Sequence, residues 1–334
     1  MDITNRRHLH AVAADRLEKA RDLPKIALIY GGIVVLSSLF SATVSFFIGQ
    51  QINNFGGLQN MGTRSILATI QNILPLVIQM VLMALELGFL NVMVRTARGQ
   101  YASPQSLKLG FDRFWLLFKT TLLESGVYCI ALMGSFYLSS QIFMITPLSK
   151  GFRELVTPMV ETGSSFNPML MMDDADIVAR LSLSMVPLLI LMTVVAIAVI
   201  LPLSYRYRMV NYLVIDKPGI PATLALGESW RMMKHNCVKL FKVDLSLWWY
   251  YVALVLGVLL CYGDMLLPLV GINLSMPASL SYFVFLILYL LVNLAIILFL
   301  RPRVEVTYAL CYDAIRPQDS PQTGGAVLGS SFNM

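Results

Sequence analysis

Long stretches without a charged residue dominate the pattern of hydrophobic and polar positions. The longest cover residues 26–63, 65–85, 125–149, 181–205, 245–263 and 265–300. A helix that crosses the hydrocarbon core of a bilayer needs about 20 mainly apolar residues. Trimmed at turn signals, these stretches predict six transmembrane helices at about 25–49, 65–94, 115–145, 181–214, 238–263 and 279–300. The predicted fold class is therefore an all-α, polytopic membrane protein.

The composition agrees with this pattern. Hydrophobic residues make up 57% of the 334 residues and charged residues only 13%. Soluble domains average about 25% charged residues, so an ordinary water-soluble globule is excluded. The expected organisation is a cytoplasmic N-terminal helix at 1–24, a membrane domain at 25–316 and a disordered cytoplasmic tail at 317–334 that is rich in Gly, Ser, Pro and Gln.

The basic residues predict the orientation. Of the 25 lysines and arginines, all but Arg64, Lys150, Arg153 and Arg180 fall on one side of the predicted membrane. Cytoplasmic loops carry the excess of Lys and Arg, so both termini are expected in the cytoplasm of a multi-pass inner-membrane protein. The net charge of +6 is then a topology signal with anionic lipid headgroups as partners, and no nucleic-acid partner is expected.

Parts of the chain resemble each other. Leu117-Phe118-Lys119 recurs as Leu240-Phe241-Lys242, and Leu201-Pro202 with Tyr212 matches Arg301-Pro302 with Tyr312. We interpret this as a repeated helical hairpin, although apolar helices can also share such residues by chance. Within the second copy, 227–242 shows helical periodicity with a basic face, which predicts one amphipathic helix that enters the membrane obliquely.

Short motifs connect the chain to a known family. They are Leu17-Glu18-Lys19-Ala20-Arg21-Asp22-Leu23, Gly110-Phe111, Ala225-Leu226-Gly227-Glu228-Ser229, and the late Pro302 with Thr307, Ala309 and Tyr312. In these motifs the chain resembles the bacterial six-span family called domain of unknown function 975. The resemblance implies a multispan membrane protein and brings no established reaction with it.

Three acidic residues fall inside predicted spans and are the first candidates for a functional site, namely Glu86, Glu124 and Asp244. A charge at the bilayer centre costs about 2.5–3.5 kcal/mol on the gentler scales, so such residues are functional candidates. The expected cavity rim or headgroup-binding cations are Lys119, Arg206, Arg208, Lys242, Arg301 and Arg303. Together they predict a polar cavity open to the cytoplasm. The alternative is that each acid pairs with a neighbouring Lys or Arg and only fixes the helix register.

The catalytic inventory is poor. His8, His10 and His235 are the only histidines, the four cysteines are scattered, and no phosphate-binding loop or zinc motif is present. A hydrolase built on Ser246 or Cys129 near an acid would need a facing base. We therefore expect no metal, no cofactor and a non-enzymatic, transporter-like or lipid-interacting protein. The alternative is an accessory or scaffold protein that docks a membrane-protein partner through its basic cytoplasmic helices.

Overall fold

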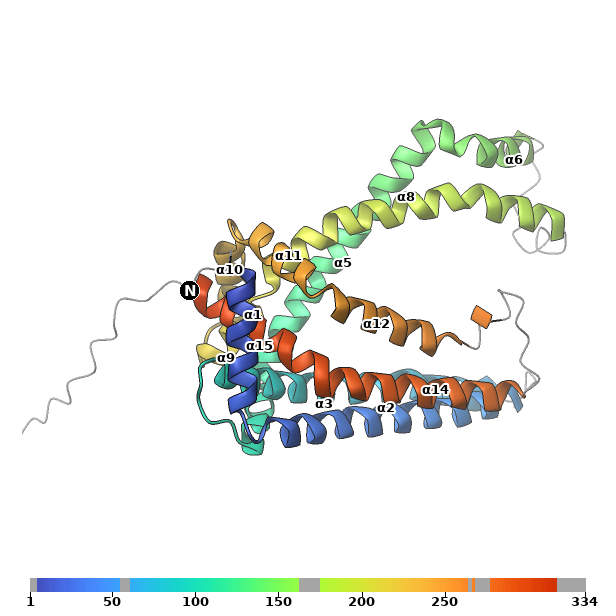
Figure 1. Ribbon diagram of the computed structural model, residues 1–334. Helices are drawn as coiled ribbons and strands as arrows, with labels where there is room; N and C mark the ends of the chain where they lie inside the picture. The colour runs from blue at the N-terminus through green and yellow to red at the C-terminus, as the bar shows by residue number, and fades with distance from the viewer. Residues whose placement is uncertain (1–4, 55–60, 162–174, 264–265, 268–276, 317–334) are drawn as a thin grey trace, which may run out of the picture. The chain divides into compact units, whose positions relative to one another are not determined.

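The computed structural model describes residues 5–54, 61–161, 175–263, 266–267 and 277–316, and every regular element among them is helical (Figure 1). The elements are α1 (Arg6–Lys19), α2 (Leu23–Asn54), α3 (Met61–Ala97), η2 (Pro104–Lys108), α4 (Leu109–Asp112), α5 (Phe114–Ile145), η3 (Pro147–Ser149), α6 (Lys150–Glu161), α8 (Ala175–Tyr207), α9 (Val210–Asp216), α10 (Ala222–Met233), α11 (Cys237–Ser246), α12 (Trp248–Cys261), α14 (Ala278–Ala295), η4 (Ile296–Leu300) and α15 (Arg301–Ile315).

The all-α polytopic fold is confirmed. Within the described residues, five helical segments are long and apolar enough to cross a membrane, starting at Leu23, Gly62, Phe114, Leu183 and Leu280. The α11 and α12 pair adds a sixth crossing if the two helices count as one span, and they meet at a bend of 69°. The six predicted transmembrane helices therefore correspond to five single membrane-length helices and one bent helix pair.

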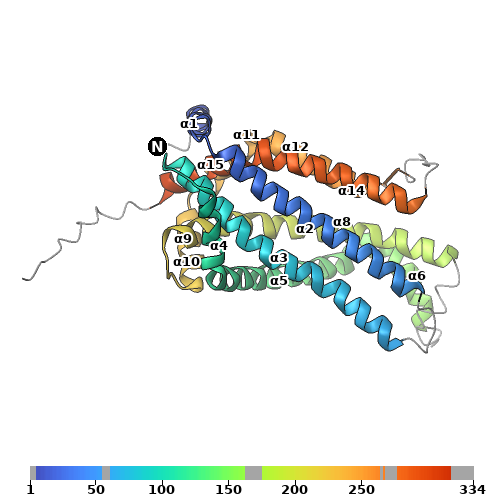
Figure 2. The ribbon, with the colours of Figure 1, turned by 90° about the horizontal axis from the view of Figure 1, so that it is seen from below.

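The chain divides into two compact units, and each is described by itself. Unit 1 contains Met1–Leu117, Asn211–Ile220 and Lys234–Met334. In it α2 packs along α3 and also against α14, while α1 packs against α15 and α3 and lies across the ends of the long helices (Figure 1, Figure 2). The α1 helix starts at a favourable cap, because the Asn5 side chain accepts a hydrogen bond from the His8 backbone N–H.

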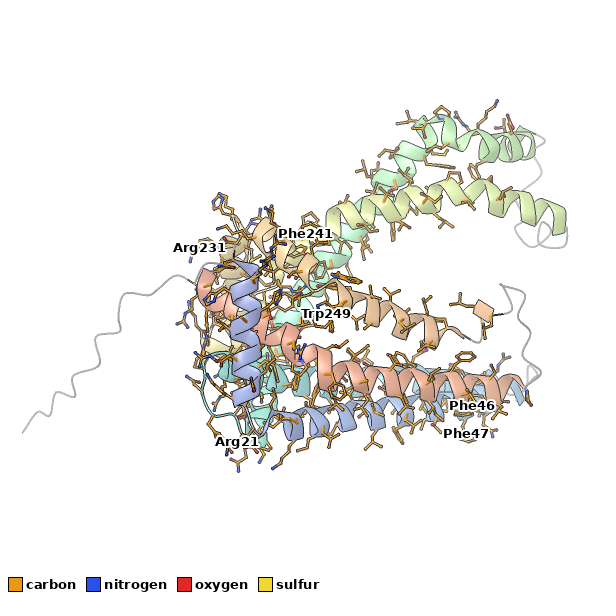
Figure 3. All side chains as sticks on the ribbon, in the orientation of Figure 1. Arg21, Phe46, Phe47, Arg231, Phe241 and Trp249 are labelled. Atoms are coloured by element: carbon orange, nitrogen blue, oxygen red, sulfur yellow. The ribbon has the colours of Figure 1, made fainter. Side chains whose placement is uncertain are left out.

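Aromatic side chains mark one end of the apolar part of unit 1. Phe46 of α2 stacks on Tyr282 of α14, with ring centroids 5.8 Å apart, and contacts Phe283 edge-on at 5.0 Å. Figure 3 shows Phe46 and Phe47 at the opposite end of α2 from Arg21. From Tyr282 to Leu300 the helix rises about 27 Å at 1.5 Å per residue, close to the roughly 30 Å thickness of a bilayer core. The apolar part of unit 1 thus has the length of one membrane crossing.

Unit 2 contains Phe118–Val210 and Pro221–Met233. Its longest helices are α5 and α8, and α8 packs against α6, η3 and α10. Pro187 and Pro202 lie inside α8, as Pro75 lies inside α3. The C-terminal end of α8 carries Arg206 and contacts the short helix α10, where the Ser229 hydroxyl donates to the Arg206 carbonyl.

Two helix boundaries differ from the expectation. The prediction of a single amphipathic helix over 227–242 was wrong, because one helix ends at Met233 and another begins at Cys237. The last span was expected to end at Leu300, but η4 and α15 carry the helix on to Ile315. Pro302 is tolerated there because it occupies the first turn of α15, where a missing N–H costs little. The tail predicted to be disordered at 317–334 lies outside the described residues.

Candidate functional site

The predicted acid Glu86 and the predicted rim cation Arg301 form an ion pair in unit 1. Nη2 of Arg301 donates to Oε1 of Glu86 at 2.5 Å, and Nη1 donates to the hydroxyl of Tyr30 at 2.8 Å. The guanidinium carbon also lies 5.4 and 5.7 Å from the ring centres of Tyr30 and Phe89. A cation at the end of an apolar helical run is thus held by one carboxylate, one hydroxyl and two aromatic faces.

Polar side chains continue as a stripe along one face of α15 and end at Arg316, the residue that follows this helix. Its members are Arg301, Glu305, Tyr308, Tyr312 and Arg316, spaced four, three, four and four residues apart. Glu305 lies 3.6 Å from Nε of Arg301 and accepts a hydrogen bond from the Tyr212 hydroxyl at 3.3 Å. We call these five residues the α15 stripe. They run through the interior of unit 1, where Tyr308 and Tyr312 are buried.

The second predicted acid, Asp244, meets the α15 stripe through hydroxyl groups. Asp244 is buried, with 6% of its surface exposed, and its Oδ1 accepts a hydrogen bond from the Tyr308 hydroxyl at 2.5 Å. The hydroxyl of Tyr251 lies 3.1 Å from that of Tyr308. Hydrogen bonding to a buried carboxylate satisfies its lone pairs, so this contact ties α11 and α12 to α15.

Arg98 joins three elements at the end of unit 1. Its guanidinium makes a bidentate contact with Asp216, at 2.7 and 2.9 Å, and also contacts Asp313 at 2.6 Å. Arg316 donates to the same Asp216 carboxylate at 2.8 Å. Hydrogen bonds to Asp216 and then to Asp313 raise the pKa of Arg98 well above its ordinary value, so this cation stays charged at every relevant pH.

Two of these contacts join positions that the sequence repeat aligns. Tyr212 stacks on Tyr312 with ring centroids 5.3 Å apart, and Asp216 pairs with Arg316. Both pairs are separated by the same 100 positions that relate Leu201-Pro202 to Arg301-Pro302. Matching positions in contact are what a duplicated unit would produce around a local two-fold axis. The duplication itself stays a prediction.

The third predicted acid, Glu124, belongs to unit 2 and has aromatic neighbours. The hydroxyl of Tyr128, one turn further along α5, hydrogen-bonds its carboxylate. The ring of Tyr128 meets that of Tyr207 edge-on at 6.2 Å, and Tyr207 lies 5.7 Å from Trp230. The guanidinium of Arg206 lies over the Trp230 ring, 4.8 Å from its centre. We call these five residues the unit 2 cluster.

The remaining predicted cations are placed as follows. Lys119, Lys242 and Arg303 are exposed, and Arg208 is half-buried within electrostatic reach of Tyr128. Glu86 and Arg301 are brought together, whereas Glu124 and Asp244 belong to different units, so their common cavity stays a prediction. Sequence reasoning missed three tyrosine hydroxyls: Tyr30 bonds Arg301, Tyr128 bonds Glu124 and Tyr308 bonds Asp244. The regular spacing of polar residues after Arg301 is a signal that could have found the last of them.

One histidine meets one serine in unit 1. Nε2 of His10 lies 2.8 Å from Oγ of Ser246, and that hydroxyl also donates to the Val243 carbonyl at 2.6 Å. A hydroxyl has one proton to donate, so the ring nitrogen is the donor in this pair. That polarity is opposite to the one a serine nucleophile needs from its base. Burial, followed by the charge of Arg6, lowers the pKa of His10.

Among the described residues no group of three or more His, Cys, Asp or Glu side chains could hold a metal ion. No curated protein and no solved structure matches the chain. The family model described as "Protein of unknown function (DUF975)" matches residues 1–319. The chain therefore belongs to this family, as its short motifs suggested.

Proposed function

We propose that this protein is a non-enzymatic integral membrane protein that binds a lipid-like amphiphile, in a transporter-like or lipid-interacting role. The observation that carries the proposal is the unit 2 cluster, in which a carboxylate on a membrane-length helix is hydrogen-bonded to Tyr128 and belongs to a chain of aromatic contacts that runs through Tyr207 to Trp230. Glu124 has a tyrosine hydroxyl as its hydrogen-bond partner. Ionisable groups at this depth are costly and mark ligand or ion pathways.

The other two acids support this choice by contrast. Glu86 pairs with the buried Arg301, and Asp244 accepts a short hydrogen bond from Tyr308. Both contacts link helices of unit 1 to α15, so we assign these acids to holding the fold together. Glu124 is hydrogen-bonded within its own helix, one turn away, and that contact joins no second helix. The functional weight of the predicted site therefore falls on Glu124.

The proposal includes the orientation inferred from the basic residues. With both termini in the cytoplasm, the polar end of unit 1 and the Arg206 end of α8 face the cytoplasmic leaflet. That leaflet carries anionic lipids, which attract lysines and arginines near the surface by about 1 kcal/mol each. The cluster would then be reached from the cytoplasmic side of the membrane.

The test is lipid retention. The protein is purified in mild detergent, and co-purifying lipids are quantified by mass spectrometry for the wild type, Glu124→Gln and Glu154→Gln. Glu154 is an exposed acid paired with Lys150 on α6 and serves as the matched control. We expect Glu124→Gln to lose most of the retained lipid at an unchanged melting temperature and Glu154→Gln to retain it. Equal retention in all three proteins contradicts the proposal.

A second candidate function rests on the outward face of α11. Val238, Phe241 and Leu245 are exposed there, at 66%, 45% and 61%, beside the exposed Lys239 and Lys242. An apolar ridge flanked by lysines suits docking on another membrane component. Crosslinking from position 241 in native membranes separates the candidates, because a stoichiometric protein partner favours the accessory role and crosslinks to lipid alone favour the first proposal.

A further inference from the structure

The outward face of α11 is apolar and continues into α12. Three large apolar side chains of α11 are exposed at spacings of three and four residues, namely Val238, Phe241 and Leu245. We call them the α11 ridge. The same spacing carries on across the bend to four exposed side chains of α12, which are Trp248, Val252, Val255 and Leu259. Because α12 belongs to a candidate membrane span, the solvent of its outward face also reaches the ridge.

The inward face of α11 fixes which side the ridge presents. Leu240 is completely buried, and the buried Asp244 accepts a hydrogen bond from Tyr308 of α15 at 2.5 Å. The Ser246 hydroxyl lies 2.8 Å from Nε2 of His10 on α1. Polar contacts therefore hold α11 to two other helices of unit 1, so it cannot rotate and bury the ridge.

Aromatic residues mark the level of the bend. α12 begins with Trp248-Trp249-Tyr250-Tyr251, and the Tyr251 hydroxyl lies 3.1 Å from that of Tyr308. Figure 3 shows Phe241 and Trp249 near the place where α11 and α12 meet. Trp and Tyr concentrate at the two membrane–water interfaces, so this sequence is typical of a span that starts at the headgroup level.

The bend sets the direction of α11. The two helices meet at 69°, and transmembrane helices tilt by about 20° on average. A helix that leaves such a span at this angle lies close to the membrane plane. Its ten residues, about 15 Å at 1.5 Å per residue, then run along the surface of the bilayer rather than across it.

Two lysines border the ridge. Lys239 and Lys242 are exposed and three residues apart, so they lie on the same side of α11. A lysine stem covers apolar surface while its ammonium reaches outward. Interfacial helices present this combination of an apolar face with lysines beside it, and anionic headgroups attract the lysines. An anionic bilayer surface offers acyl chains to the ridge and phosphates to the lysines.

We infer that α11 is an in-plane interfacial helix that binds an anionic leaflet, with the α11 ridge among the acyl chains and Lys239 and Lys242 at lipid phosphates. The inference goes beyond the proposed function and does not depend on the unit 2 cluster, because α11 belongs to unit 1. Through its contacts with His10 and Tyr308, α11 ties α1 and α15 to the membrane surface.

The test measures the depth of α11 in vesicles of phosphatidylcholine and phosphatidylglycerol. The full-length protein carries one spin-labelled cysteine at position 238, 239, 241, 242 or 245. Its background is Cys129→Ala, Cys237→Ala and Cys261→Ala, and the buried Cys311 stays. Collisions with oxygen report acyl chains, and collisions with a neutral nickel chelate report water. We expect the oxygen-to-nickel ratio to be about threefold higher at the three ridge positions than at the two lysine positions.

Three other patterns overturn the inference. A depth that increases steadily from 238 to 245, over about 10 Å, makes α11 part of a crossing span. Equal access of nickel at all five positions leaves the ridge in water, where a protein partner would have to cover it. Access of neither reagent to the ridge means that a second copy of the chain covers it. A melting curve for every variant confirms that folded protein is compared.

Matched variants test the charge of the lipid. The double variant Lys239→Gln/Lys242→Gln is compared with Lys150→Gln, which changes an exposed lysine beyond the far end of α5. Replacing phosphatidylglycerol by phosphatidylcholine should lower the oxygen-to-nickel ratio at position 241 about twofold when both α11 lysines are present. The double variant should lose this dependence, and Lys150→Gln should keep it. A ratio that does not change with the headgroup, with both lysines present, contradicts binding to an anionic leaflet.

Discussion

The helical run from Ala278 to Ile315 contains two halves with opposite relations to solvent. The first half, α14, carries no charged residue and exposes large apolar side chains such as Leu280, Ile287 and Leu291. The second half, α15, carries arginines and acids, yet nine of its 15 residues are buried. Lipid solvates the first half, whereas protein surrounds the second. Burial in this protein therefore does not follow hydrophobicity along the chain.

The same contrast occurs within α3. Its first part exposes Ile66, Ile73 and Leu76, while Leu87, Val92 and Met93 near its other end are almost completely buried. Unit 1 thus resembles a membrane protein at one end of its long helices and a packed soluble core at the end that meets α15. The closest packing is expected where helices meet α15, η2 and α4.

The largest effect is expected from Gly88→Ala in the buried part of α3. A Cβ at Gly88 would overlap the backbone carbonyl of Leu107, which cannot move aside as a side chain can. Overpacking costs about 1–3 kcal/mol or more, and a backbone clash lies at the upper end. We expect little folded protein by size-exclusion chromatography. Gly62→Ala, in the exposed part of the same helix with open space around it, should fold normally, and equal behaviour of the two variants would contradict the contrast.

The next effect compares two leucines of α3. Leu87→Ala removes a side chain that is 2% exposed. It should lower the free energy of unfolding in detergent by about 3 kcal/mol, as core truncations do. Leu76→Ala removes one that is 58% exposed and should change the free energy of unfolding by less than about 0.5 kcal/mol. Both are measured by denaturant titration of the purified protein. A larger loss at Leu76 would mean that its surface is covered by protein in the assembled state.

A smaller loss is expected from Arg98→Gln. The substitution leaves two facing carboxylates, Asp216 and Asp313, without their shared cation. Breaking a buried pair costs about 3–5 kcal/mol, but the Arg98 side chain is 25% exposed, so we expect about 2 kcal/mol. Lys19→Gln breaks an exposed pair with Asp15 and should cost less than about 0.5 kcal/mol. Comparable losses would show that Arg98 is solvated like a surface residue.

The smallest effect is a pH dependence of the contact between α1 and α11. The pKa of His10 is lowered in the folded protein, so the unfolded state binds more protons than the folded state once the pH falls below about 6.5. The contribution of His10 is therefore complete above that pH and is lost as the pH falls towards the folded pKa. We expect the protection factors for amide exchange in α1, which are corrected for the intrinsic pH dependence of exchange, to be lower at pH 5 than at pH 8.

Two variants control this experiment. His10→Gln should remove the difference between the two pH values, because it can still donate to Ser246 but does not titrate. His8→Gln changes an exposed histidine of the same helix and should leave the difference unchanged. A pH dependence that survives in His10→Gln assigns the effect to another group.

The fold class followed from the sequence because lipid-facing helices need long apolar runs, and such runs are visible residue by residue. The 234–236 break between α10 and α11 did not follow, since the apolar and basic periodicity continues across it and tertiary packing decides where a helix ends. The extension of the last helix was also missed. Arg301 and Pro302 are typical of the end of a span, but packing against α3 and α1 stabilises α15 beyond them.

The sequence predicted the candidate site by residue type and left the pairing of those residues open. The cost of charge in a membrane singled out Glu86, Glu124 and Asp244. Their partners lie far away in the chain, as Tyr308 lies 64 positions from Asp244, and no local pattern encodes such a contact. Arg301 pairs with Glu86 from another helix, as in the alternative that each acid pairs with a Lys or Arg, and its place at a cavity rim stays a prediction.

The π-helical turn η4 lies where the lipid-exposed half of the last helix meets the buried half. Such a turn accommodates one extra residue in an α-helix, and one residue corresponds to about 100° of rotation. The turn therefore rotates α15 about the helix axis relative to α14. The apolar surface of α14 can then face outward while the stripe of α15 faces inward. Shortening the chain by a single residue at Ile297 would leave a regular helix but turn Arg301 and Tyr308 away from Glu86 and Asp244.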